Sequence, residues 1–344
     1  MRAMAVTAYG APLQKVEVPE PDLLPGHALV EVLTCGVCFS DVKTSQGLMP
    51  YSDRLQLPHV PGHEICARVL ETDPPGVIDA GTKVVVYHVW PCRMCARCRA
   101  GEDNLCTDPR GWTGFTHPGG FQDRLVVPLD RVVSVPDSID EVHAAPLTCA
   151  LGTAYRAVVT RGGVRPGTRA VVIGLGGVGI HALQVATAAG AAAVGLDVSQ
   201  AAIDAARELG LEAHRQDEPD AVARLVPTTD EGVDVVIDTV GHSATIHQAE
   251  RLVRPGGRIV AVGYSVMEEF ALPAARLVLE EVHLLGSRYV RLAELERAIA
   301  MVASGRIRTV VSAVKPLEQA NDAFQSLIDG RIVGRVVLDV AGVA

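Results

Sequence analysis

The chain has 344 residues, of which 48% are hydrophobic, so it is long enough for two domains with sizeable cores. Its net charge of −9 argues against general affinity for nucleic acid or for an anionic membrane. The first residues, MRAMAVTAYG, turn polar too quickly for a signal peptide. We therefore expect a cytoplasmic protein with eight reduced cysteines, which favours metal binding or catalysis over disulfides.

Residues 1–150 consist of short valine-rich runs separated by proline and glycine, such as HALVEVLTCGV and DRLVVPLDRVVSVP. This pattern predicts the strands of a mainly antiparallel domain. Residues 151–290 alternate between apolar strand and helix signals, from RAVVIG and VGIHALQVATAAG to VDVVIDTVG and GRIVAVG. That alternation indicates an α/β domain with a parallel, doubly wound sheet.

Beyond residue 290 the sequence predicts a helix in RLAELERAIAMVASG and a last strand in GRIVGRVVLDV. From the residues alone, this tail could complete the second domain or return to the first. Residues 170–196 carry no charged side chain and could suggest a membrane helix. Because glycines divide this stretch into a strand, a helix and a strand, we interpret it as a buried β-α-β unit.

The strand RAVVI leads directly into GLGGVG, which matches the dinucleotide-binding pattern G-x-G-x-x-G. The first glycine permits a tight turn, the second lets the backbone approach a pyrophosphate, and the third lets helix and strand pack closely. The predicted phosphate-binding loop therefore consists of Gly174, Gly176, Gly177, Val178 and Gly179.

Asp197 ends the next strand, 18 residues after Gly179. A carboxylate near this offset binds a ribose 2′-hydroxyl and repels a 2′-phosphate, so NAD is favoured over NADP as the cofactor. The alternative is that Asp197 only caps the helix that starts near Ser199.

Four cysteines in one short loop have the spacing C-x2-C-x2-C-x7-C: Cys92, Cys95, Cys98 and Cys106. Four thiolates can surround a tetrahedral zinc ion and leave no open position, so such a site would be structural. An iron–sulfur cluster or redox-active thiols are alternatives, although the spacing is not the usual one for a cluster. Nearby arginines could suggest a nucleic-acid finger, but the chain is acidic and offers no recognition helix.

A second set of candidate ligands is spread along the chain. Cys38 lies in CGVCFSD, His63 in PGHE and Cys149 in APLTCALGTAY. Two cysteines and one histidine with an open fourth position form the catalytic zinc site of an alcohol dehydrogenase. Each residue could instead be a buried core side chain, because distance in sequence does not show proximity in space.

These motifs, together with GGFQDRLVVP, occur in the order found in zinc-dependent medium-chain alcohol dehydrogenases. The chain resembles this family over essentially its whole length. The resemblance implies a GroES-like, mainly β catalytic domain in residues 1–150, to which residues 291–344 return. It also implies a Rossmann NAD-binding domain in residues 151–290 and assembly into homodimers or homotetramers.

The resemblance further implies that Cys38, His63 and Cys149 hold a catalytic zinc and that the four-cysteine loop holds a structural one. The chain would then bind two zinc ions and NAD. Asp41 is implied to orient His63, as carboxylates commonly do for metal-bound histidines, and Glu64 to lie beside the zinc. 

Ser40 is implied to hand on the substrate proton, Thr153 to lie beside the nicotinamide, and Arg335 to contact a cofactor phosphate. Phe39 stands where many members carry an Arg or His that pairs with the pyrophosphate. We therefore predict weaker phosphate binding and faster NADH release, or compensation by Arg335. Lys43 stands where many carry a histidine that ends the proton relay. A lysine could relay only if burial lowered its pKa; otherwise water would complete the relay.

We therefore predict a zinc- and NAD-dependent alcohol dehydrogenase or carbonyl reductase that acts on a primary or secondary alcohol. One alternative is the same chemistry on a larger hydroxylated metabolite, such as a cyclic or CoA-linked alcohol; another is a non-catalytic NAD-binding relative. Ala145 replaces the glutamate ligand of polyol-type members and argues against a polyol enzyme. Cys35 and Cys66 match no ligand position and are expected in buried strands.

Overall fold

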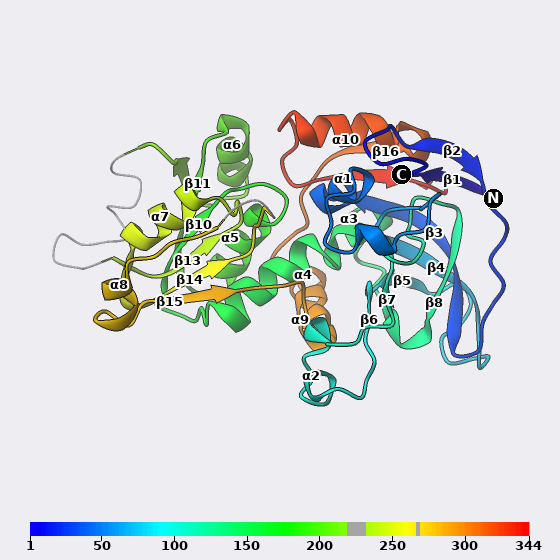
Figure 1. Cartoon of the computed structure of the whole chain (residues 1–344), viewed down its shortest axis with the longest axis horizontal. Helices are drawn as coiled ribbons and strands as arrows, with labels where there is room; N and C mark the ends of the chain where they lie inside the picture. Colours follow the sequence, from blue (N-terminus) through cyan, green and yellow to red (C-terminus); the bar gives the residue numbers. More distant parts are fainter. Residues whose placement is uncertain (219–231, 266–268, 344) are drawn as a thin grey trace. The chain divides into compact units, whose positions relative to one another are not determined.

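The computed structural model describes residues 1–218, 232–265 and 269–343 (Figure 1). The chain forms two compact units. The first unit contains Met1–Cys149, Arg291–Gly305 and Val311–Ala344, and the second contains Ala150–Val290 and Arg306–Val310. Residues 306–310 thus pack with the second unit, although they lie inside the tail predicted to return to the first domain. Within the described residues, no helix is long and apolar enough to cross a bilayer.

The first unit is built on a seven-stranded sheet. Six strands follow the order β16-β17-β3-β4-β5-β9, and the seventh, β8, pairs with β3 outside this order. Its strands are β3 (His27–Val37), β4 (Glu64–Thr72), β5 (Lys83–Val86), β8 (Arg124–Pro128), β9 (Val132–Ser134), β16 (Val311–Pro316) and β17 (Arg335–Asp339). The predicted antiparallel character holds for the pairs among β3, β4, β5, β8, β9 and β17, whereas β16 runs parallel to β17.

The central strand β3 is buried without interruption from Val32 to Val37, so both faces of the sheet are covered there. Val30, Val32 and Val37 of β3 are fully buried. Cys35 of β3 and Cys66 of β4 are also fully buried, as the sequence predicts.

Shorter elements surround the large sheet. Two small antiparallel pairs are formed by β1 (Arg2–Ala5) with β2 (Gln14–Glu17) and by β6 (Val89–Trp90) with β7 (Gly111–Trp112). The helices are α1 (Phe39–Ser45), α2 (Ala96–Arg99), α3 (Glu141–Ala144), α9 (Leu292–Ala303) and α10 (Ala320–Ile328). Single 3-10 turns occupy Ser52–Arg54, Asp103–Leu105, Leu129–Arg131, Ala145–Leu147 and Leu317–Gln319.

The second unit contains a six-stranded, all-parallel sheet with the order β12-β11-β10-β13-β14-β15. Its strands are β10 (Arg169–Ile173), β11 (Ala192–Asp197), β12 (Ala213–Arg215), β13 (Val233–Asp238), β14 (Val253–Ala261) and β15 (His283–Gly286). The strand order reverses between β10 and β13, which is the switch point of a doubly wound sheet and the usual place for a dinucleotide. The predicted fold class is therefore confirmed for this unit.

The helices of the second unit are α4 (Ala150–Tyr155), α5 (Gly179–Ala188), α6 (Gln200–Glu208), α7 (Ser243–Leu252) and α8 (Ala274–Val278), and a π-helical turn covers Arg156–Arg161. The uncharged stretch 170–196 forms β10, α5 and β11, with β10 and β11 paired in parallel. It is a buried β-α-β unit, as interpreted from its glycines.

Candidate active site and metal centres

Three neighbouring strands of the first unit bring distant residues to one end of the sheet. The register pairs Gly36 with Glu64 and Val37 with Val336, so the end of β3 lies beside the starts of β4 and β17. Cys38 directly follows β3, His63 directly precedes β4 and Arg335 opens β17. These residues meet because the strands pair, not because they are near in sequence.

Four side chains form a buried cluster at this place: Cys38, His63, Glu64 and Cys149. One candidate ligand atom from each lies within 4.8 Å of the others. Nδ1 of His63 is 2.8 Å from Oδ1 of Asp41, while its buried Nε2 has no hydrogen-bond partner in the described part of the chain. A metal-bound histidine has this arrangement, with one nitrogen held by a carboxylate and the other left for the ion. The residues therefore fit a zinc ion.

Asp41 connects the two loops that carry these ligands. Besides the His63 ring, its carboxylate accepts the backbone N–H of Cys38 at 2.9 Å and that of Gly62 at 3.3 Å. Asp41 is fully buried in α1, so all of its contacts are shielded from water. The carboxylate can orient ligands from both loops at once.

The charges around the cluster favour thiolate at Cys38. The pKa of Cys38 is well below its ordinary value, mainly because the Cys149 thiol donates a hydrogen bond to it and also because of the positive charge of Arg335. The same shared hydrogen bond, together with burial, raises the pKa of Cys149. A bound cation would favour the thiolate form of both residues.

Glu64 forms a buried ion pair with Arg335. Nε of Arg335 lies 2.9 Å and 3.0 Å from the two carboxylate oxygens, and Nη2 lies 3.7 Å from Sγ of Cys38. Burial raises the pKa of Glu64 to about 7, although the charge of Arg335 acts to lower it. Arg335 is only 4% exposed. Its implied contact with a cofactor phosphate remains a prediction, and the pair with Glu64 is a contact that the sequence did not indicate.

Helix α1 also carries the residues assigned to the proton relay and to the cofactor phosphates. Ser40 is partly buried, and Phe39 is 49% exposed. Nζ of Lys43 lies 5.9 Å from the centre of the Phe39 ring. Burial lowers the pKa of Lys43, and a lysine can take part in a proton relay only if its pKa is lowered in this way.

The second cysteine cluster has its four sulfur atoms within 4.8 Å of one another: Cys92, Cys95, Cys98 and Cys106. Backbone N–H groups point at these sulfurs, from Cys95 to Cys92 at 3.3 Å and from Cys92 to Cys106 at 3.2 Å. Such donors lower the pKa of Cys95 to about 5, the N–H of Cys98 being the largest contributor. Four convergent sulfurs supported by backbone donors fit a closed, structural zinc site.

In the second unit, two glycines of the GLGGVG loop cannot carry a side chain. Gly174 has φ of +85°, which favours glycine. A Cβ on Gly179 would lie 1.7 Å from the carbonyl oxygen of Gly174. A Cβ on Gly176 would instead meet no atom within 4 Å, so the space beside this residue is open. This open surface at the end of β10 fits a bound pyrophosphate.

Asp197 lies at the end of β11, next to this loop. Its carboxylate accepts the N–H of Leu175 at 2.5 Å and the N–H of Ser199 at 2.8 Å. The N-cap of α6 is Ser199, whose hydroxyl accepts the N–H of Ala202 at 3.4 Å. Asp197 is thus held between the loop and α6, in a position that fits a ribose-binding carboxylate. Thr153, the predicted nicotinamide neighbour, is buried in α4.

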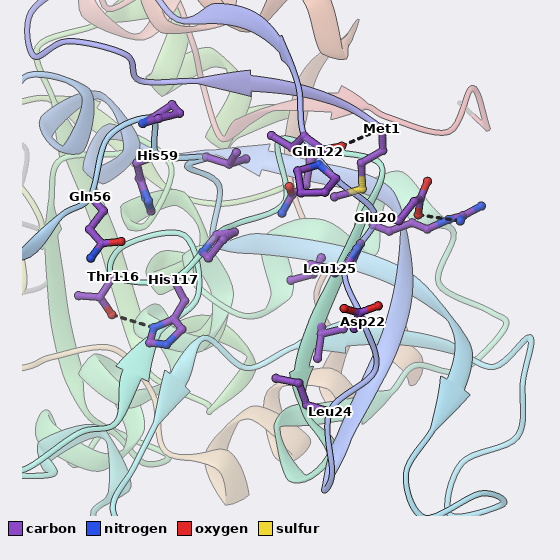
Figure 2. A pocket seen from close by; sticks show the side chains of 18 of the residues that line it. Met1, Glu20, Asp22, Leu24, Gln56, His59, Thr116, His117, Gln122 and Leu125 are labelled. Carbon is purple, nitrogen blue, oxygen red and sulfur yellow. Dashed lines mark hydrogen bonds and ion pairs between the residues drawn. The ribbon is translucent and has the colours of Figure 1, made fainter.

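The first unit also contains a large cavity, which His59, His117 and Leu24 help to line. Its volume is about 890 Å³, and Figure 2 shows His59 and His117 on one side and Met1 and Leu24 on another. None of the predicted site residues is among those that line it. We therefore do not assign it to the zinc or dinucleotide chemistry.

Comparison with known proteins gives a consistent result. The family model for the alcohol dehydrogenase GroES-like domain matches residues 24–137, and the model for zinc-binding dehydrogenases matches residues 177–304. An alcohol dehydrogenase of Geobacillus stearothermophilus is 33% identical over 99% of this chain and 100% of its own length. An NAD-dependent alcohol dehydrogenase of Sulfurisphaera tokodaii is 32% identical over 98% of this chain and 99% of its own length.

Solved structures agree with this result. The crystal structure of an NAD-dependent alcohol dehydrogenase has a TM-score of 0.91 to this chain at 30% identity, covering 99% of this chain and 100% of that one. The chain therefore belongs to the zinc-dependent medium-chain alcohol dehydrogenase family. The predicted combination of a GroES-like domain with a Rossmann domain is confirmed, as is the predicted enzyme class.

Proposed function

We propose that the protein transfers hydride reversibly between a primary or secondary alcohol and NAD, at a zinc ion held by Cys38, His63 and Cys149. The observation that carries this proposal is the buried ligand cluster, in which Nε2 of His63 is left for a metal while Asp41 holds Nδ1. The names of the relatives support NAD as the cofactor.

Bound zinc supplies Lewis-acid polarisation of the alcohol oxygen, and NAD supplies the hydride acceptor. The protein supplies the geometry. Asp41 accepts the Nδ1–H of His63 and so fixes the lone pair of Nε2 toward the ion. Arg335 lies beside Sγ of Cys38 and favours its thiolate form. Burial of all four cluster residues keeps bulk water from the ligands.

Proton removal is assigned to α1. Ser40 would accept the hydroxyl proton of the alcohol and pass it outward, with Lys43 as the next acceptor. Lys43 sits one helical turn beyond Ser40, and burial lowers its pKa, so the neutral amine is more accessible than in an exposed lysine. Glu64, which Arg335 holds, is a further acidic neighbour of the ligands.

The four-cysteine loop is proposed to hold the second, structural zinc. This loop is tied to helix α9 by Glu102, whose carboxylate pairs with Arg97 at 2.8 Å and with Arg291 at 2.9 Å. Because Arg291 is the N-cap of α9, an ordered loop also stabilises the start of that helix. We expect loss of this zinc to lower stability rather than to remove a reacting group.

We further propose NAD rather than NADP as the cofactor, because Asp197 presents a carboxylate beside the glycine loop. We propose a cytoplasmic homodimer or homotetramer. In support, β15 is an outermost strand of its sheet, and the apolar side chains of Val278, Leu279 and Leu284 are exposed at or near this edge. An exposed apolar sheet edge fits a second copy of the chain.

The test is a screen of the zinc-loaded protein over primary, secondary, cyclic and CoA-linked alcohols and their carbonyl counterparts, followed through NADH absorbance. We expect turnover with small primary or secondary alcohols, lost on chelation and restored by zinc. Turnover restricted to cyclic or CoA-linked alcohols would keep the chemistry and change the substrate. Absence of turnover with every compound would contradict the proposal.

A further inference from the structure

His181 is a fully buried histidine in α5, two residues beyond Gly179, and has no part in the proposed chemistry. Its Nε2 accepts the backbone N–H of Val310 at 2.9 Å, and its Nδ1 lies 2.7 Å from the carbonyl oxygen of Gly177. Because a backbone N–H can only donate, Nε2 carries the lone pair and Nδ1 carries the hydrogen, which it donates to Gly177. One neutral tautomer therefore satisfies both contacts.

Gln184 bonds Arg308, in the same segment as Val310, to the same face of α5 as His181. The two side chains share this face because residues three apart on a helix are neighbours. Its Nε2 donates to the carbonyl of Arg308 at 3.0 Å, and its Oε1 accepts the N–H of Arg308 at 3.1 Å. The segment is packed as well as bonded, because Ile307 and Thr309 are 5% and 2% exposed. The backbone of residues 308–310 is thus fixed along the helix that follows the glycine loop.

The contact at Gly177 bears on the predicted phosphate-binding surface. A trans peptide is planar, so the carbonyl of Gly177 and the N–H of Val178 point in opposite directions from one rigid plane. The ring of His181, which also contacts residues 308–310, donates its hydrogen bond to the carbonyl of Gly177. The N–H of Val178 is therefore directed away from His181. The loop has few side chains of its own that could fix this plane.

We propose that His181 is a positioning residue for the dinucleotide. Through its hydrogen bond to Gly177, it orients the N–H of Val178 for the pyrophosphate. Through its hydrogen bond to Val310, it makes cofactor affinity depend on the position of residues 308–310. This inference rests on the proposed NAD-dependent function, and it extends that function to a residue outside the glycine pattern. The imidazole contacts the glycine loop and residues 308–310, and it would not contact the reacting atoms.

The test measures three quantities for each variant of the zinc-loaded full chain. The Kd for NADH is obtained by fluorescence titration, and the KM values for NAD and for alcohol are obtained from steady-state kinetics. His181→Leu fills the space but loses both hydrogen bonds, and we expect the Kd for NADH and the KM for NAD to rise about tenfold. The KM for alcohol and the zinc content should not change. His181→Gln keeps one donor and one acceptor and should recover most of the affinity.

His247→Leu is the matched control, because His247 is an exposed histidine on α7 of the same unit, and we expect wild-type values from it. Failure of the wild-type protein to bind NADH would refute the proposed function itself. If the wild type binds NADH and a folded His181→Leu variant binds it equally well, the inference is wrong. Should that variant not fold, His181→Asn provides the comparison, and unchanged NADH affinity there has the same meaning.

Discussion

At the scale of single residues, buried carboxylates decide how the zinc ligands are held. Asp41 bonds the ring of His63 and the backbone of Cys38 and Gly62, so it braces two loops from one buried point. Glu64 has a different partner, because Arg335 takes both of its oxygens. Two acids near one metal site thus have separate roles set by their neighbours.

Replacing Asp41 with Asn keeps the shape of the side chain and removes its charge. We expect zinc affinity at the catalytic site to fall about 10–100-fold, the usual cost of losing such a support. Chelator competition followed by metal analysis measures this affinity. Asp204→Asn, on the exposed face of α6, is the control. Equal zinc retention by wild type and Asp41→Asn would show that Asp41 does not brace His63.

Phe39 offers no positive charge to a cofactor phosphate, and half of its surface is exposed. A Phe39→Arg variant should bind NADH more tightly, by about two- to tenfold, because a charged hydrogen bond adds roughly 0.5–1.5 kcal/mol at a partly exposed site. Phe39→Leu separates the gain of charge from the loss of the ring and should not tighten binding. Unchanged or weaker NADH affinity in the Arg variant would remove Phe39 from the cofactor site.

Lys43 gives a prediction about pH. Burial lowers its pKa, so in the folded protein its neutral form is reached at lower pH than in an exposed lysine. A relay that needs the neutral amine becomes faster as pH rises through that lowered value. Lys43→Ala should lose this rise in kcat, and Lys43→Arg should lose it too because its side chain stays protonated. Superimposable pH–rate profiles would mean that water completes the relay.

At the residue scale, the motifs of a known family indicated Cys38, His63 and Cys149 as ligands, and the structure places their candidate ligand atoms close together. The motifs did not indicate the pair of Glu64 and Arg335, which are 271 residues apart. The two residues meet because β4 and β17 both pair with the end of β3. For His181 the sequence pattern predicts only a position in a helix. Its partner Val310 lies 129 residues away, and no local pattern signals that contact.

At the scale of elements, the glycine loop shows two different reasons for a missing side chain. Gly179 has no room, since its Cβ would collide with Gly174, whereas Gly176 faces open space. Gly179→Ala should therefore lower the free energy of unfolding by about 2 kcal/mol or more. Gly176→Ala should leave that free energy within about 0.5 kcal/mol of wild type but weaken NADH binding at least tenfold, because its methyl group would occupy phosphate space.

Urea unfolding and NADH titration of both variants test this distinction. Gly286→Ala is a suitable control, because a Cβ there also meets open space but lies away from the loop, on β15. If Gly176→Ala bound NADH as tightly as wild type, the open surface beside Gly176 would not be the pyrophosphate site.

The strands and helices themselves were largely predictable. Alternating apolar runs indicated β10, α5, β11, α6, β13 and β14, and valine-rich runs indicated β3, β8 and β9. The position of β16 beside β17, in an otherwise antiparallel sheet, could not be read from composition because both are short apolar runs. Pairing partners are decided by packing over the whole unit, and local residue patterns do not contain that information.

At the scale of the whole molecule, the chain distributes its proposed chemistry over two units. Both cysteine clusters belong to the first unit, and the glycine loop and Asp197 belong to the second. Along the sequence, the cysteine motifs likewise precede the glycine loop. The assignment of residues 306–310 to the second unit was not predictable, because the segment contacts His181 and Gln184, which lie more than 120 residues away in the sequence.

We propose that Cys38, His63 and Cys149 hold a catalytic zinc distinct from the ion in the four-cysteine loop. The most direct measurement is zinc per chain, with NAD-linked alcohol oxidation, in wild type, Cys38→Ser and Cys66→Ser. Cys66 is a fully buried strand cysteine outside both clusters and so controls for the loss of a thiol. We predict two zinc ions per chain in wild type and Cys66→Ser, and one zinc with no turnover in Cys38→Ser. One zinc in wild type with full turnover, or an active Cys38→Ser variant, would contradict the account.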